Sequence, residues 1–101
     1  SASFGLADAG IEPDPENSIN QLQELFQKKY VGEPKYKFRE DYGDYWHCEC
    51  ICGEFAGSGI AESKVKAKKK AAYCTLIWIL ESAGICKEEW KRVMWKMKAT
   101  L

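Results

Sequence analysis

Apolar residues recur every three or four positions over residues 17–30, and this spacing predicts an amphipathic helix. Asn17 or Ser18 can cap its amino end, and Gln21 stands three positions after Ser18, as in a capping box. The face opposite the apolar stripe is polar and carries a single carboxylate. The stripe consists of Ile19, Leu22, Leu25, Phe26 and Tyr30, and the polar face consists of Asn20, Gln23, Glu24 and Gln27.

The pattern then changes to alternation, which predicts two half-buried strands. Residues 35–39 alternate two aromatic rings with basic side chains, and residues 45–52 place Trp46 and three cysteines on one face. A turn over residues 41–44 separates these two strands. A third strand is expected to start within residues 54–57.

The rest of the chain is interpreted around residues 57–72. The glycines of residues 57–62 indicate a turn, and Ser63 is suited to cap a helix that runs to about Ser82. The first turns of that helix carry five lysines. Its free amides, the positive end of its dipole and the lysines all favour an anion nearby, so we expect a phosphate-binding site here.

The same helix is apolar at almost every position from 71 to 80. A helix that packs on a sheet buries one stripe, so a helix that is apolar all round needs a cover on a second side. Residues 87–98 predict a third amphipathic helix, which we expect to pack on residues 76–80. The alternative is that the apolar carboxyl-terminal region forms an interface with a second copy or another protein. The third helix has its apolar residues at Trp90, Val93, Met94 and Met97.

These elements predict one α+β domain, in which helices pack on one face of a small antiparallel sheet. We expect a flexible acidic leader over residues 1–16, the folded domain over 17–86, and a carboxyl-terminal amphipathic helix over 87–101 that packs on the domain. A chain of 101 residues is long enough for one such domain and too short for two.

The formal net charge is zero, which by itself argues against a nucleic-acid partner. The zero conceals an asymmetry. Residues 1–16 carry four acids and no base, whereas residues 63–72 carry five lysines and no acid. The basic field is therefore local.

The five cysteines form an odd set, and three of them alternate along a predicted strand, which does not suit a local disulfide. Reduced thiols and an intracellular setting, cytoplasmic or nuclear, fit best. The apolar run over residues 71–80 is too short to cross a bilayer, so we expect no membrane partner.

Metal and enzyme chemistry are poorly supported by the sequence. No Cys-x-x-Cys pair is present, and cysteines on the core face of a strand behave as small hydrophobes, so we expect no zinc and no other cofactor. The lone His47 lies among aromatic and acidic residues, with no nucleophile elbow in the sequence. We therefore expect a non-catalytic chain.

Residues 57–72 carry two glycines two positions apart, then a serine, and after it lysines and alanines at a regular spacing. With the helix and strands that come before them, these residues make positions 17–82 resemble the double-stranded-RNA-binding domain (dsRBD) family. The family pattern is a Gly-x-Gly lead followed by Ser-Lys-Lys-x-Ala-Lys-x-x-Ala-Ala. The spacing of the lead, together with Leu22, Gln23 and Glu24, is closest to the domains behind ribonuclease III catalytic modules. The residues that match the pattern are Gly57, Gly59, Ser63, Lys64, Ala67, Lys68, Ala71 and Ala72.

The resemblance implies an α-β-β-β-α fold that binds A-form RNA duplex by its shape, with little dependence on sequence. It places the first helix in one minor groove, the loop between the first two strands in the next, and the start of the second helix on phosphates between them. The residues implied to contact RNA are Asn20, Gln23, Glu24, Gln27, Ser63, Lys64 and Lys68, with Lys66, Lys69 and Lys70 as substitutes.

Two departures from the family pattern weaken the expected RNA contact. Val65 occupies the place of the second family lysine, and Lys69, one turn further on, is its partial replacement. The loop over residues 41–45 is short and acidic where the family has Gly-Pro-x-His, and His47 falls within the strand. We expect weaker RNA affinity than that of a three-contact domain, or dependence on a neighbouring module.

Two functions therefore stay open. The first is non-catalytic binding of double-stranded RNA, as a module of an RNA-processing or RNA-silencing protein. The second is a protein-interaction module of the same fold that forms dimers and has weak or no RNA affinity. No paired-carboxylate motif of a ribonuclease III catalytic module is present, so any RNA cleavage by a parent protein needs an active site elsewhere.

Overall fold

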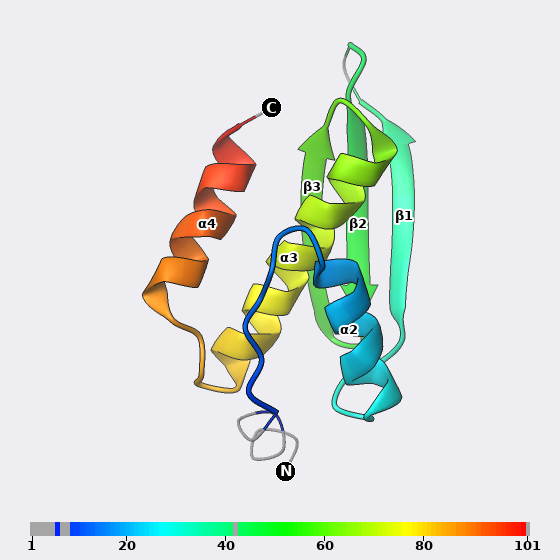
Figure 1. The fold of residues 1–101 in the computed structure, drawn as a ribbon. Helices are drawn as coiled ribbons and strands as arrows, with labels where there is room; N and C mark the ends of the chain where they lie inside the picture. Colours follow the sequence, from blue (N-terminus) through cyan, green and yellow to red (C-terminus); the bar gives the residue numbers. More distant parts are fainter. Residues whose placement is uncertain (1–5, 7–8, 42, 101) are drawn as a thin grey trace.

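The computed structural model describes residues 6, 9–41 and 43–100, in which a helix is followed by three strands and two further helices (Figure 1). The strands form an antiparallel sheet of order β1-β2-β3. Helices α2 and α3 pack on one face of this sheet, and α4 lies on the side of α3 away from α2 (Figure 1). The predicted α+β fold with an extra carboxyl-terminal helix is therefore confirmed. The elements are α2 (Ser18–Gln27), β1 (Pro34–Glu40), β2 (Trp46–Cys52), β3 (Phe55–Ala61), α3 (Lys64–Ser82) and α4 (Glu88–Ala99).

The core lies between α3, the sheet and α2. Leu22 and Leu25 of α2 are buried, and the cysteines of β2 are buried on the face that the helices cover. The apolar run of α3 is buried almost completely, because the sheet covers one side of it and α2 and α4 cover others. Within the described residues, no helix is long and apolar enough to cross a membrane.

The turn predicted over residues 57–62 is wrong, because residues up to Ala61 continue as strand β3. The glycines there permit close packing of a helix on a strand. A Cβ atom on Gly59 would lie 2.5 Å from the Cβ of Lys70, and one on Gly57 would lie 2.5 Å from the Oγ1 of Thr75. Glycine is thus required on β3 because α3 approaches its backbone directly.

The amino end of α2 is fixed by the segment before it. The predicted capping box does not form, since Asn17 is the N-cap and makes no side-chain cap hydrogen bond. Gln21 instead donates from Nε2 to the carbonyl of Glu12 and accepts from the backbone N–H of Asp14, at 2.7 and 2.9 Å. These bonds tie the preceding residues to the helix.

The predicted flexible leader falls partly outside the described residues, at 1–5, 7 and 8. Its described residues contact the domain, since Leu6 is buried in the core and Ile11 packs against it. The carboxylate of Glu16 lies 2.9 Å from the Nζ of Lys69. The acidic segment therefore places a negative charge beside the lysines of α3.

Helix α4 packs along α3 through its apolar stripe, with Met94 buried. The Tyr73 hydroxyl donates to the carbonyl of Trp90 at 3.1 Å, and the Nζ of Lys91 lies 2.9 Å from the carboxylate of Glu81. Contacts from Tyr73 to Glu81 extend beyond the predicted region 76–80, because α4 runs alongside α3 (Figure 1).

Candidate nucleic-acid interface

The family resemblance implies three RNA-contacting parts: helix α2, the loop between β1 and β2, and the start of α3. Helix α2 lies beside one end of β1, whereas the described residues between β1 and β2 (41 and 43–45) and the start of α3 lie near the other end of the sheet (Figure 1). The loop is closed by a hydrogen bond from the Asp41 N–H to the Tyr45 carbonyl at 2.8 Å. Gly43 has a φ of 74°, which the absence of a Cβ makes accessible.

The polar face of α2 points to solvent. All four residues predicted to contact RNA on this helix are exposed, because its apolar residues face the core. The Nδ2 of Asn20 donates to the Oδ1 of Asn17 at 2.8 Å, in an exposed position. The face therefore offers amide donors and acceptors. These residues are Asn20, Gln23, Glu24 and Gln27.

The start of α3 has the electrostatic character predicted for an anion site. Ser63 is its N-cap, and its hydroxyl oxygen accepts a hydrogen bond from the backbone N–H of Lys66 at 3.2 Å. The first turn carries no acid, so the positive end of the helix dipole is not neutralised within it. Val65, in this turn, has 61% of its surface exposed.

The five lysines of α3 fall into two sets, and the three of the first set pair with carboxylates or backbone carbonyls of the protein. Lys66 pairs with Glu62, and this hydrogen bond lowers the pKa of Glu62 and raises that of Lys66. Lys69 pairs with Glu16. Lys70 donates from Nζ to the backbone carbonyls of Ile60 and Thr100, at 3.1 and 2.6 Å.

Lys64 and Lys68 lie on another side of α3, one turn apart, over aromatic rings of the sheet. The Nζ of Lys64 is 4.6 Å from the ring centroid of Trp46 and 5.6 Å from that of Phe38. The Nζ of Lys68 is 4.6 Å from the ring centroid of Tyr36. The geometry thus separates these two lysines from the other three.

The sequence analysis predicted the strands that carry the aromatic rings, but it did not predict that these rings lie under Lys64 and Lys68. Alternation places Tyr36 and Phe38 on one face of β1 and Trp46 on the same face of β2. The register pairs Tyr36 with Cys50 and Phe38 with Cys48, which brings both rings to the helix side of the sheet. The sequence signal that could have indicated these contacts is the spacing of Lys64 and Lys68, because residues four apart lie on the same side of a helix.

The cysteines belong to the core. All five thiols are free, and those of Cys48, Cys50 and Cys52 are buried. Burial raises the pKa of Cys48 and of Cys52 to about 12, because an apolar environment disfavours the thiolate. Among the described residues, no group of three His, Cys, Asp or Glu side chains is placed to hold a metal ion.

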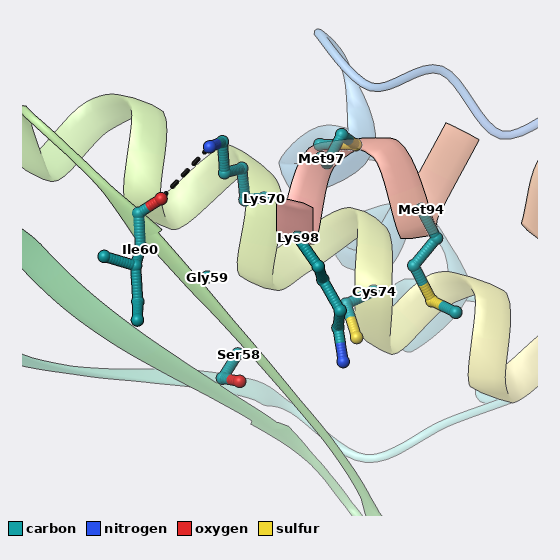
Figure 2. A pocket seen from close by; sticks show the side chains of 8 residues that line it. All are labelled: Ser58, Gly59, Ile60, Lys70, Cys74, Met94, Met97 and Lys98. Atoms are coloured by element: carbon teal, nitrogen blue, oxygen red, sulfur yellow. Dashed lines mark hydrogen bonds between the residues drawn. The ribbon is translucent and has the colours of Figure 1, made fainter. Parts of the chain in front are cut away.

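A separate cavity of about 200 Å³ lies between β3, α3 and α4. Figure 2 shows Lys70 turned toward the Ile60 carbonyl, with the side chains of Met94 and Met97 entering from α4. The cavity is away from α2 and from the rings under Lys64 and Lys68. It is lined by Ser58, Gly59, Ile60, Lys70, Cys74, Met94, Met97 and Lys98.

Comparison with known proteins agrees with this arrangement. The family described as double-stranded RNA binding motif matches residues 18–78, which run from the start of α2 into α3. The chain belongs to the double-stranded RNA binding motif family. The family match ends before α4, so that helix is an addition to the matched part.

A ribonuclease 3 from Roseburia hominis is 34% identical to the chain over 84 residues. The matched part covers 77% of this chain and 24% of the relative, so the chain spans about a quarter of that protein's length. No solved structure matches the chain.

Proposed function

We propose that this chain is a non-catalytic module that binds double-stranded RNA by its A-form shape, with little dependence on sequence. The observation that carries the proposal is the position of Lys64 and Lys68. Their ammonium groups lie together on one side of α3, at a capped helix start without acids. Phosphates across the major groove of a duplex are the groups that such a cationic pair binds.

The polar face of α2 supplies the second contact of the proposal. Its exposed amides can donate to and accept from ribose hydroxyls and base edges in the shallow minor groove of RNA, and the Glu24 carboxylate can accept from them. The 2′-hydroxyl distinguishes RNA from DNA at such a contact. We assign this role to Asn20, Gln23, Glu24 and Gln27, and the phosphate role to Lys64 and Lys68 with Ser63 as the cap.

Lys66 and Lys69 have a smaller role in the proposal than the one predicted for them from the family pattern. Their ammonium groups face Glu62 and Glu16, which reduces the positive field that a phosphate meets there. Both pairs are exposed on at least one side and therefore weak, so a strong anion can displace the carboxylates. In the proposal, Lys69 replaces the missing lysine at position 65 only in part, because it must first release Glu16.

The similarity to ribonuclease 3 supports an RNA-processing parent protein, in which catalysis would belong to a part of that protein outside this module. Double-stranded RNA is the proposed partner, and the free thiols favour an intracellular setting. No cofactor has a role in this binding.

A protein-interaction module is the second candidate, and specific features favour it. Val65 lacks the positive charge of the family pattern, the loop over residues 41–45 carries acids, and the net charge is zero. A second copy would bind through the apolar carboxyl-terminal region, where Trp95 of α4 is 55% exposed.

The substitution Lys68→Ala tests the phosphate role. Binding to two RNA duplexes of unrelated sequence should weaken by the same factor, about fivefold or more, because a contact to phosphate does not depend on the base sequence. The slope of log K against log salt should become shallower by about one unit. Fluorescence titration at several salt concentrations measures both quantities.

Lys37→Ala is the matched control. Lys37 is exposed on β1 between Tyr36 and Phe38, so it points to the opposite face of the sheet. The control removes the same charge and should leave affinity within about twofold, a change of less than half a kcal/mol. Equal losses in both variants would show a general charge effect and contradict the assigned site.

A further inference from the structure

The two lysines of the proposed RNA site share a property that the other lysines of α3 do not show. Each ammonium group lies within the 6 Å range of cation–π attraction from an aromatic ring of the sheet: Lys64 over Trp46 and Phe38, and Lys68 over Tyr36. The partners of the other three lysines are carboxylates or carbonyls.

The rings occupy the part of the sheet that the helices leave partly open. Phe38 keeps 37% of its surface exposed, and Trp46 and Tyr36 are half-buried, although their neighbours on β2 are fully buried cysteines. The stems of Lys64 and Lys68 extend from α3 across this opening. An apolar stem over a ring with a charged end in water is a favourable position for lysine.

The ring contact restricts the lysine side chain before any ligand binds. A free lysine on a helix surface samples many rotamers, and ordering it on a phosphate loses that freedom. A lysine already held over a ring loses less when it binds. The ring covers one side of the ammonium group, so N–H donors on the other sides stay available to a phosphate oxygen.

We propose that Tyr36 and Trp46 are positioning residues, which hold the ammonium groups of Lys68 and Lys64 one helical turn apart for two phosphates of an RNA duplex. This inference rests on the proposed function. In this proposal the rings contact lysine and not RNA, and Phe38 provides a second ring 5.6 Å from the Nζ of Lys64. Because Val65 stands where the family pattern has a third lysine, RNA affinity should depend more strongly on the positions of Lys64 and Lys68.

The hydroxyl of Tyr36 provides a sharp control. It is buried beside the Cys50 thiol, and within the described part of the chain it has no hydrogen-bond partner of good geometry. The hydroxyl is therefore not what holds Lys68. Tyr36→Phe keeps the ring and removes this hydroxyl. Tyr36→Leu keeps an apolar side chain of moderate size and removes the ring.

A double-mutant cycle tests the pair Tyr36 and Lys68. The wild type, Tyr36→Leu, Lys68→Ala and the double variant are titrated with an RNA duplex of about sixteen base pairs at several salt concentrations. Thermal unfolding of each variant fixes a temperature at which all are folded.

Tyr36→Leu alone should weaken binding about fivefold, the factor that corresponds to an exposed cation–π contact. It should leave the salt slope unchanged, since Lys68 still neutralises a phosphate, whereas Lys68→Ala should reduce the slope by about one unit. In the Lys68→Ala background, Tyr36→Leu should change affinity by less than about twofold. Tyr36→Phe should bind like the wild type.

Equal losses from Tyr36→Leu with and without Lys68 would overturn the proposal, because the ring would then act through the fold. Tighter binding by Tyr36→Leu would also overturn it, since the ring would be competing with phosphate. The same cycle with Trp46→Leu and Lys64→Ala gives an independent second test. Wild-type protein that fails to bind the duplex refutes the proposed function, whereas wild-type binding without coupling refutes the positioning role alone.

Discussion

Val65 stands at the start of α3 between two lysines, and 61% of its surface is exposed. An exposed apolar side chain gains little from burial, so stability does not explain its presence there. The family pattern that the chain resembles has lysine at this place. At the scale of single residues, we therefore expect that the proposed RNA binding is most easily strengthened by a substitution at Val65.

Val65→Lys should tighten binding to an RNA duplex a few-fold and steepen the slope of log K against log salt by about one unit. The added charge has room in solvent, and stability should change by less than about 0.5 kcal/mol. Titration at several salt concentrations measures the slope. Val65→Ala is the control. If the lysine variant binds RNA no more tightly than the alanine variant, the proposal that RNA phosphates lie close to residue 65 is contradicted.

Single residues also show where sequence reasoning reached its limit. Helical spacing places Lys64 and Lys68 on one side of α3 and separates them from Lys66. What lies beneath them depends on the register of β1 on β2 and on the position of α3 over the sheet. Both are set by tertiary packing, so the rings under the lysines could not be read from spacing alone.

At the scale of elements, the contact between β3 and α3 fixes the start of α3 over the sheet. Backbone atoms of the two elements approach closely at Gly57 and Gly59. The sequence predicted a turn here because glycine is unfavourable inside strands. The close approach of α3 outweighs that local preference, and this is why the prediction was wrong while the helix itself, with its Ser63 cap, was confirmed.

Gly59→Ala should destabilise the protein by about 1–3 kcal/mol, as overpacking of a tight contact does. The added Cβ would lie 2.7 Å from the carbonyl oxygen of Ala67, which belongs to the rigid backbone of α3. Urea unfolding measures the loss. Ser58→Ala, one residue earlier on the same strand, is the control and should change stability by less than about 0.5 kcal/mol. Equal unfolding midpoints for the two variants would contradict this expectation, because they would show that β3 and α3 can move apart without a decrease in stability.

Other elements were predicted well because their patterns are strong. The apolar stripe of α2, the alternation of β1 and β2 and the i, i+3, i+4, i+7 spacing of α4 all correspond to observed elements. The capping box at Ser18 failed because Gln21 binds residues 12 and 14, which lie earlier in the chain and carried no periodic signal.

At the scale of the whole molecule, a zero net charge is compatible with a local cationic site. Acids and lysines are separated along the sequence, and the fold brings some of them together again, as at Glu16 and Lys69. The surface that we propose for an RNA duplex therefore consists of Lys64 and Lys68 together with the polar side chains of α2. Helix α4 lies on the side of α3 away from α2 and contacts α3 and β3 (Figure 1).

The most direct test is titration of the wild-type chain with an RNA duplex of about sixteen base pairs and with a DNA duplex of the same sequence, at several salt concentrations. Sedimentation of the free protein and of the complex gives the oligomeric state. A monomer should bind RNA more tightly than DNA. Its slope of log K against log salt should be about −1.8 or steeper, since each of two phosphate contacts contributes about −0.9. A tight dimer that binds neither duplex would contradict the RNA-binding proposal and support the protein-interaction module.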